Sequence, residues 1–179
     1  MILVNLALVI LLVVALNVSF FWKHRKRKQH TWEELVAALQ PVALPRLEIV
    51  ARHHLRLEAA PLALESDQVW ELLGGFEGLE RLRTNASLMI ELAAHVARWN
   101  SEEGTIVCEW IRHDAVALRR AVLRIEIAHA CRKFYPGAWL RHPFHLNEAA
   151  SAYYVMRQRL LALYENNHAA FYPRLAEAL

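Results

Sequence analysis

The chain of 179 residues carries 21 Lys and Arg side chains against 18 Asp and Glu, which gives a formal net charge of +3. Residues 1–30 hold five of the basic side chains and no acidic one, so residues 31–179 hold 16 basic against 18 acidic side chains, a formal charge of −2. Because domains that bind nucleic acid through phosphate contacts usually carry an excess of positive charge, we expect no nucleic-acid partner.

The first 22 residues form an apolar run without a single charged side chain. As a helix this run would be about 33 Å long, enough to cross a hydrocarbon core of about 30 Å. A cleaved signal peptide would need a positive start and small residues at a cleavage site, whereas this run ends in bulky aromatic residues. We therefore predict that residues 1–22 are a single transmembrane anchor, embedded in the lipid bilayer.

A basic juxtamembrane segment, residues 23–30, follows the apolar run. Positive charges mark the cytoplasmic side of a membrane span, so we expect the N-terminus outside and the rest of the chain in the cytoplasm, at a bacterial inner membrane. The same charges would attract anionic lipid headgroups, and a lipid- or pH-sensing role with His24 and His30 is a further reading. The predicted interface residues are Trp22, Lys23, Arg25, Lys26, Arg27 and Lys28.

Residues 31–75 read as short helices and a linker. Thr31 and Glu34 are spaced as a capping box that opens a helix ending before Pro41. A second helix is expected over 46–59, with Leu47, Val50, Ala51 and His54 on one side. Ser66 is placed to cap a short third helix, which Gly74 and Gly75 should end.

Residues 76–179 are predicted to form an up-down-up three-helix bundle, so the fold class is all-α. Apolar side chains recur at alternating spacings of three and four, as in a coiled coil, over 76–100, 103–134 and 147–171. Asn147 is the expected N-cap of the last of these helices, and Trp139 and Phe144 are expected to pack over the bundle end. The three predicted core lines are Leu79, Leu82, Ala86, Met89, Ala93, Val96; Cys108, Ile111, Ala115, Leu118, Val122, Ile125, His129; and Leu146, Ala149, Tyr153, Met156, Leu160, Leu163, Asn167.

Two Glu-x-x-His motifs, Glu126–His129 and Glu165–His168, have the spacing that di-iron helical bundles use. At 100° per residue, however, Glu126 and Glu165 fall on the polar side of their helices, away from the line that would hold the metal. We therefore expect Glu126 to lie on a solvated face near Arg119 or Arg124, and we assign no metal or other cofactor.

No nucleophile elbow, phosphate-binding loop or other catalytic motif occurs in the chain. The sequence specifies no reaction, and we expect an interaction or scaffolding module rather than an enzyme, with an unidentified protein or a second copy as its partner. Cys108 and Cys131, 23 residues apart on one predicted helix, are read as small core residues. The alternative is a di-iron or zinc enzyme or sensor that uses the two Glu-x-x-His motifs.

Overall fold

The computed structural model describes residues 30–55, 66–98, 103–131 and 143–179. The predicted anchor, residues 1–22, and all of the basic segment except His30 lie outside these ranges. No helix among the described residues combines the length and apolar character needed to cross a bilayer. The chain divides into two units, Met1–Glu34 and Leu35–Leu179, and each is described by itself.

In the first unit, the predicted capping box is confirmed at the start of α2 (Trp32–Ala37). The Glu34 amide donates to Thr31 Oγ1 at 3.3 Å, and the Thr31 amide donates to Glu34 Oε2 at 3.0 Å. These bonds satisfy two backbone donors that a helix N-terminus otherwise leaves open. The hydrogen bond from the Thr31 amide is also the main reason why the pKa of Glu34 is lowered.

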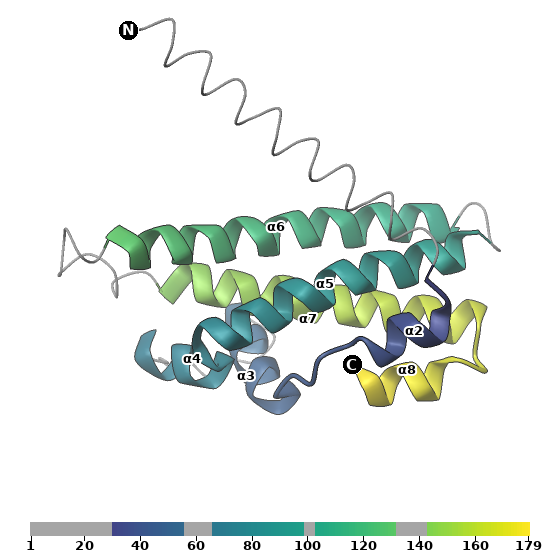
Figure 1. Cartoon of the computed structure of the whole chain (residues 1–179), viewed down its shortest axis with the longest axis horizontal. Coiled ribbons are helices and arrows are strands. Elements are labelled where there is room, and N and C mark those ends of the chain that lie inside the picture. Colours follow the sequence, from purple (N-terminus) through teal and green to yellow (C-terminus); the bar gives the residue numbers. More distant parts are fainter. Residues whose placement is uncertain (1–29, 56–65, 99–102, 132–142) are drawn as a thin grey trace, which may run out of the picture. The chain divides into compact units, whose positions relative to one another are not determined.

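Every element of the second unit that the structure describes is helical, which confirms the predicted all-α class. Three long helices run alternately up, down and up (Figure 1): α5 (Gly75–Ala97), α6 (Glu103–Cys131) and α7 (Pro143–Asn167). The apolar positions predicted for the three core lines are buried, with His129 and Asn167 as the exceptions. The 3–4 spacing therefore predicts the core of this bundle, because it places apolar side chains on one side of each helix.

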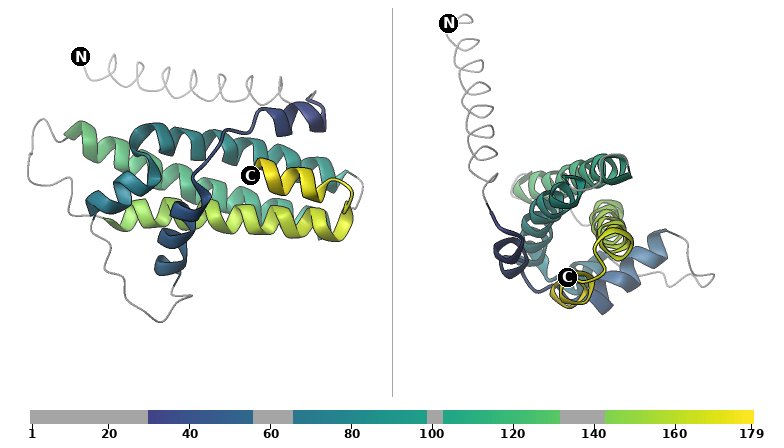
Figure 2. Two further views of the ribbon diagram at one scale, coloured as in Figure 1. Left: turned by 90° about the horizontal axis from the view of Figure 1, so that it is seen from below. Right: turned by 90° about the vertical axis from the view of Figure 1, so that its right-hand side faces the viewer.

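Helix α7 is the central element, and the bundle around it has more members than the three predicted. It contacts α5 and α6, and also α3 (Leu44–His54), α4 (Ser66–Leu73) and α8 (Tyr172–Ala178). Leu47, Val50 and Ala51 of α3 are fully buried, and α3 packs on α7 more extensively than α5 does. Viewed end-on in Figure 2, α3 and α8 lie on the far side of α7 from α6.

Several predicted helix limits differ from the observed ones. Helix α7 begins at Pro143, so Asn147 is not its N-cap but lies within its second turn. A proline can occupy the first turn because that turn has no intrahelical partner for its backbone N–H. Helix α3 ends at His54 rather than 59, and Ser66 is the first residue of α4 rather than its cap. Trp139 lies outside the described residues.

Gly74 and Gly78 allow α4 and α5 to meet without a linker. Gly74 has φ +78°, a left-handed conformation that ends α4 as the sequence predicts. Gly78 lies one turn into α5, and a Cβ added there would stand 1.7 Å from the carbonyl oxygen of Leu73. The close approach of the two helices at this corner therefore depends on the missing side chain of Gly78.

Candidate functional site

The first Glu-x-x-His motif lies near the C-terminal end of α6, and its side chains do not converge on a metal position. Glu126 Oε1 stands 3.7 Å from Arg83 Nη1 of α5, so one of its ion pairs is made with the neighbouring helix. His129 is exposed and its ring packs edge-on against Phe76 of α5, with the ring centroids 4.5 Å apart. The prediction that His129 belongs to the core line is therefore wrong.

The second motif lies at the end of α7. Glu165 is exposed, and His168 follows the last helical residue, with its ring 6.4 Å from that of Tyr164 and 6.1 Å from that of Phe171. Asn167, which was predicted in the core line, is half-buried, and its amide donates to the Leu163 carbonyl oxygen at 3.0 Å. This end of α7 is thus a packed helix terminus.

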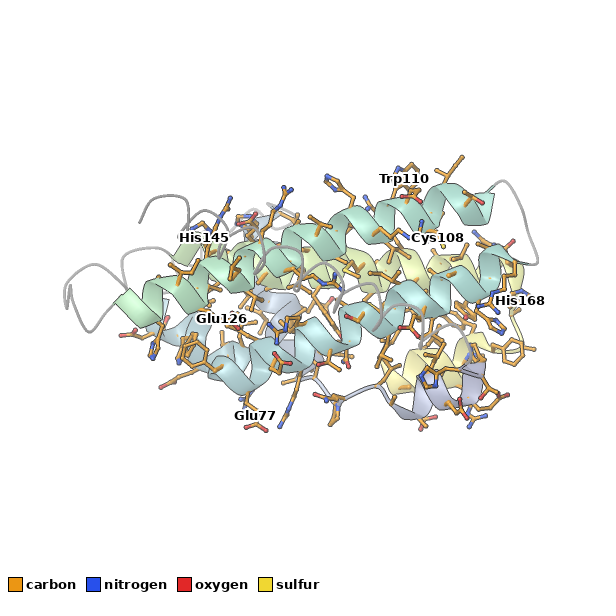
Figure 3. All side chains as sticks on the ribbon, turned by 45° about the horizontal axis from the view of Figure 1, so that its top comes forward. Glu77, Cys108, Trp110, Glu126, His145 and His168 are labelled. Atoms are coloured by element: carbon orange, nitrogen blue, oxygen red, sulfur yellow. The ribbon has the colours of Figure 1, made fainter. Side chains whose placement is uncertain are left out.

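The two motifs lie at opposite ends of the bundle, because α6 and α7 run in opposite directions and both motifs are C-terminal. Figure 3 shows the labelled side chains of Glu126 and His168 far apart along the bundle axis. A di-iron centre needs all its ligands around one metal pair, so these motifs cannot share one. Within the described ranges there is no group of three or more His, Cys, Asp or Glu side chains that could hold a metal ion.

Glu148 of α7 is the centre of a charged cluster at the other end of that helix. Its Oε2 stands 3.3 Å from His145 Nδ1 and 3.5 Å from Arg124 Nη1 of α6. Burial lowers the pKa of His54 of α3, an effect that the Glu148 carboxylate opposes. The Arg124–Glu148 pair thus links α6 to α7, and the cluster is partly open to water.

A second charged cluster joins the middle of α6 to α7. Arg159 pairs with Asp114, and its guanidinium carbon lies 5.4 Å from the centroid of the Trp110 ring, within range of a cation–π contact. Burial raises the pKa of Asp114, and Arg159 opposes this rise. On the other side of α6, Arg119 donates to Ser87 of α5 at 3.0 Å.

Asn85 of α5 forms a buried polar clasp that the sequence did not predict. Its Oδ1 accepts the Gln40 amide at 2.9 Å, and its Nδ2 donates to the Gln40 carbonyl oxygen at 2.8 Å and to Tyr153 Oη at 3.1 Å. Burial raises the pKa of Tyr153 to about 12, although the Asn85 bond opposes this rise. The only sequence signal was a polar residue beside the α5 core line, because Asn85 immediately precedes Ala86.

A pocket of about 250 Å³ lies where α4 meets α5 and the segment leading into α3. Its charged lining is balanced, with Arg46 and Arg81 against Glu71 and Glu77, and Glu77 already pairs with Arg81. Such a lining favours neither an anion nor a cation. The pocket is therefore a partly open recess with a mixed polar and apolar lining beside the Gly74 corner.

The outer side of α6 is the most unusual surface of the described residues. Seven of its side chains recur at spacings of three and four, and all are exposed: Ile106, Glu109, His113, Val116, Arg120, Leu123 and Ile127. We call these seven residues the outer line of α6. Its four apolar members have exposed fractions between 42% and 54%, and the neighbouring Trp110 is also exposed (Figure 3). Among the described elements α6 contacts only α5 and α7, so none of them covers this line.

Comparison of the chain with protein-family models, with curated proteins and with solved structures finds no match.

Proposed function

We propose that this chain is a single-pass membrane protein whose helical bundle acts as an interaction or scaffolding module at the cytoplasmic face. The anchor is the apolar run of residues 1–22, and the charges of residues 23–28 set its orientation. The bundle is the described part, and its role is to present a surface to a partner. Anchoring raises the local concentration of such a module at the membrane.

The outer line of α6 is the observation that carries this proposal. Soluble single domains rarely leave large apolar side chains aligned along a whole helix, and aligned exposed apolar groups mark interaction surfaces. The buried core line of α6 packs on α5 and α7, so the outer line is presented on a helix that the bundle holds from its opposite side. By contrast, the pocket beside Gly74 and the two Glu-x-x-His motifs offer no arrangement for a reaction.

Membrane topology is the first part of the proposal to test. The full chain would be fused at its C-terminus to green fluorescent protein, which folds in the bacterial cytoplasm, and in parallel to alkaline phosphatase, which is active only after export. We expect fluorescence, no phosphatase activity, and resistance of the membrane-bound protein to carbonate extraction. Phosphatase activity of the fusion, or release of the chain by carbonate, would contradict the proposal.

A matched variant tests the role of the basic segment. Changing Lys23, Arg25, Lys26, Arg27 and Lys28 to Gln removes every Lys and Arg within residues 1–30 while keeping the apolar run. We expect a mixed orientation in the topology assay, since the charge difference across the span is lost. We also propose that this segment binds anionic headgroups, at roughly 1 kcal/mol for each charge near the surface. Equal binding of the wild-type and neutralised proteins to anionic vesicles would contradict that second role.

A further inference from the structure

We propose that the outer line of α6 is a self-association surface on which α6 of a second copy packs antiparallel. The inference deepens the proposed function, on which it rests, by naming the partner of the interaction module as the chain itself. It is carried by the make-up, the exposure and the charge order of the outer line.

The make-up of the outer line favours a helix as the occupant. Positions three and four residues apart occur on every face of a helix, so the side chains themselves carry the argument, and the outer line mixes four exposed apolar residues with Glu109, His113 and Arg120. A second helix lying along α6 can pack on the apolar residues and pair the charged ones. A lipid surface would cover the apolar residues but would not favour Glu109 within the line.

The charge order favours an antiparallel second copy. In a parallel pair, Glu109 would face Glu109 and Arg120 would face Arg120, which is repulsive. In an antiparallel pair with its two-fold axis between His113 and Val116, Glu109 of one copy faces Arg120 of the other, twice by symmetry. The same register places Ile106 against Leu123 of the second copy, so both ends of the contact are apolar.

The existing ion pairs of these side chains leave room for the contact. Glu109 pairs with Arg112 on its own helix, and both side chains remain at least half exposed. Arg120 is exposed on the outer line itself. An additional pair across the two-fold axis would extend these ion pairs into a small network, which is worth more than an isolated surface pair.

The size of the surface predicts a weak dimer that depends on the membrane. In this register the paired stretch runs from Ile106 to Leu123, about 26 Å, and with a helix width of about 12 Å it offers roughly 300 Å² per copy. This is less than half of the roughly 800 Å² that each partner buries in a stable interface. Confinement of two anchored copies to one membrane supplies the missing association free energy, because their local concentration is much higher than in solution.

Cysteine crosslinking of the full chain in membranes tests the arrangement. Cys108 and Cys131 are first replaced by Ala, and Ile106→Cys and Leu123→Cys are then made separately on two differently tagged copies. We expect the mixed copies to form a disulfide under mild oxidation. Ile106→Cys alone should not, because the two Ile106 positions would be 17 residues apart along the helix, about 26 Å, far beyond disulfide reach. Crosslinking of Ile106→Cys with itself would show a parallel pair and overturn the proposal, as would absence of the mixed crosslink.

Charge reversal and a matched apolar control complete the test. Glu109→Arg and Arg120→Glu should each lower the mixed crosslink yield about fivefold, and the double variant should restore it, since the pair is rebuilt in reverse. Val116→Lys should abolish the mixed crosslink. The new charge would lie opposite His113 of the second copy, and the two new charges, one from each copy, would lie close together near the two-fold axis. Ile49→Lys, a similarly exposed apolar position on α3, should leave the yield unchanged.

A mixed crosslink that tolerates Val116→Lys would overturn the proposal. The topology fusions separate this outcome from a failure of the proposed function. Correct topology without the crosslink refutes only the dimer, whereas the crosslink in a chain with the wrong topology refutes only the proposed function.

Discussion

The clasp around Asn85 gives the sharpest prediction about stability. The Asn85→Leu variant replaces the asparagine with a side chain of similar size that has no polar atom. If the site were simply apolar, leucine would be neutral or stabilising, because Asn85 is fully buried. The three hydrogen bonds of Asn85 predict the opposite sign.

The magnitude follows from the three bonds and from the burial of the groups left behind. Each bond contributes about 0.5–1.5 kcal/mol, and a buried partner left unsatisfied costs more than the bond itself. Gln40, whose backbone makes two of the bonds, is half-buried, whereas Tyr153 is fully buried, so its hydroxyl is the partner whose loss costs most. Allowing for the apolar gain of leucine, we expect the free energy of unfolding to fall by about 2 kcal/mol.

Urea unfolding of the full chain in detergent, followed by far-UV circular dichroism, measures this change. Tyr153→Phe should cost about 1 kcal/mol in the wild-type protein but should stabilise the Asn85→Leu variant, because it removes a buried hydroxyl that has lost its partner. Tyr164→Phe is the control: its hydroxyl donates to the Leu92 carbonyl oxygen at 3.0 Å, two turns away, so its cost should add to that of Asn85→Leu. An Asn85→Leu protein as stable as the wild type would refute the reasoning.

Three further predictions concern a titration, a backbone contact and the metal alternative. The raised pKa of Tyr153 means that its stabilising contribution is complete below the unfolded-state pKa of about 10 and is lost as the pH rises toward 12. In a plot of unfolding free energy against pH, Tyr153→Phe should therefore flatten the alkaline part. An unchanged slope would contradict this. Gly78→Ala should lower the melting temperature far more than Gly74→Ala, because a Cβ at position 78 would stand 1.7 Å from a backbone oxygen. A Cβ at position 74 meets nothing closer than 3.6 Å, and alanine there costs only about 1 kcal/mol for the positive φ. Equal shifts in melting temperature would refute the close approach at Gly78. Replacing His129 and His168 together by Ala should leave the iron and zinc content of the purified full chain unchanged, as measured by inductively coupled plasma mass spectrometry, and loss of a stoichiometric metal would revive the metal alternative.

The core lines of α5 and α6 could be predicted from the sequence because each of these helices buries one side. Burial on one side places apolar residues three and four positions apart, and the residues predicted from this repeat are buried. The repeat fails only at His129, where α6 reaches the end of the bundle and the rings of His129 and Phe76 pack in a T-shaped arrangement. The apolar repeat of one helix carries no information about where the helices packed against it end.

Helix α7 could be predicted only in part, because it is packed on several sides. The predicted line from Leu146 to Leu163 is buried, but so are Ala150, Leu161 and Tyr164 on its other sides. A helix that is buried on several sides shows no strong apolar stripe, so the sequence of α7 does not reveal that α3 and α4 also pack on it.

The polar contacts of the candidate sites were beyond the sequence for a different reason. Gln40 and Asn85 are 45 residues apart, and their bonds exist only because the fold brings a backbone segment onto α5. The opposite placement of the two Glu-x-x-His motifs, in contrast, is implied by the predicted up-down-up order, since both motifs end antiparallel helices. The order of the helices by itself therefore argues against a metal centre shared by the two motifs.

The clasp also has a mechanical consequence. Any pulling force on the chain before Gln40 must enter the bundle through the buried side chains of Leu35 and Val36 and then through the two bonds that hold the Gln40 backbone to Asn85. Those bonds lie ahead of α3 in the load path, so they would break before α3 is peeled from α7. Tension on the preceding chain would thus load the two Gln40–Asn85 hydrogen bonds before it loads the contact between α3 and α7.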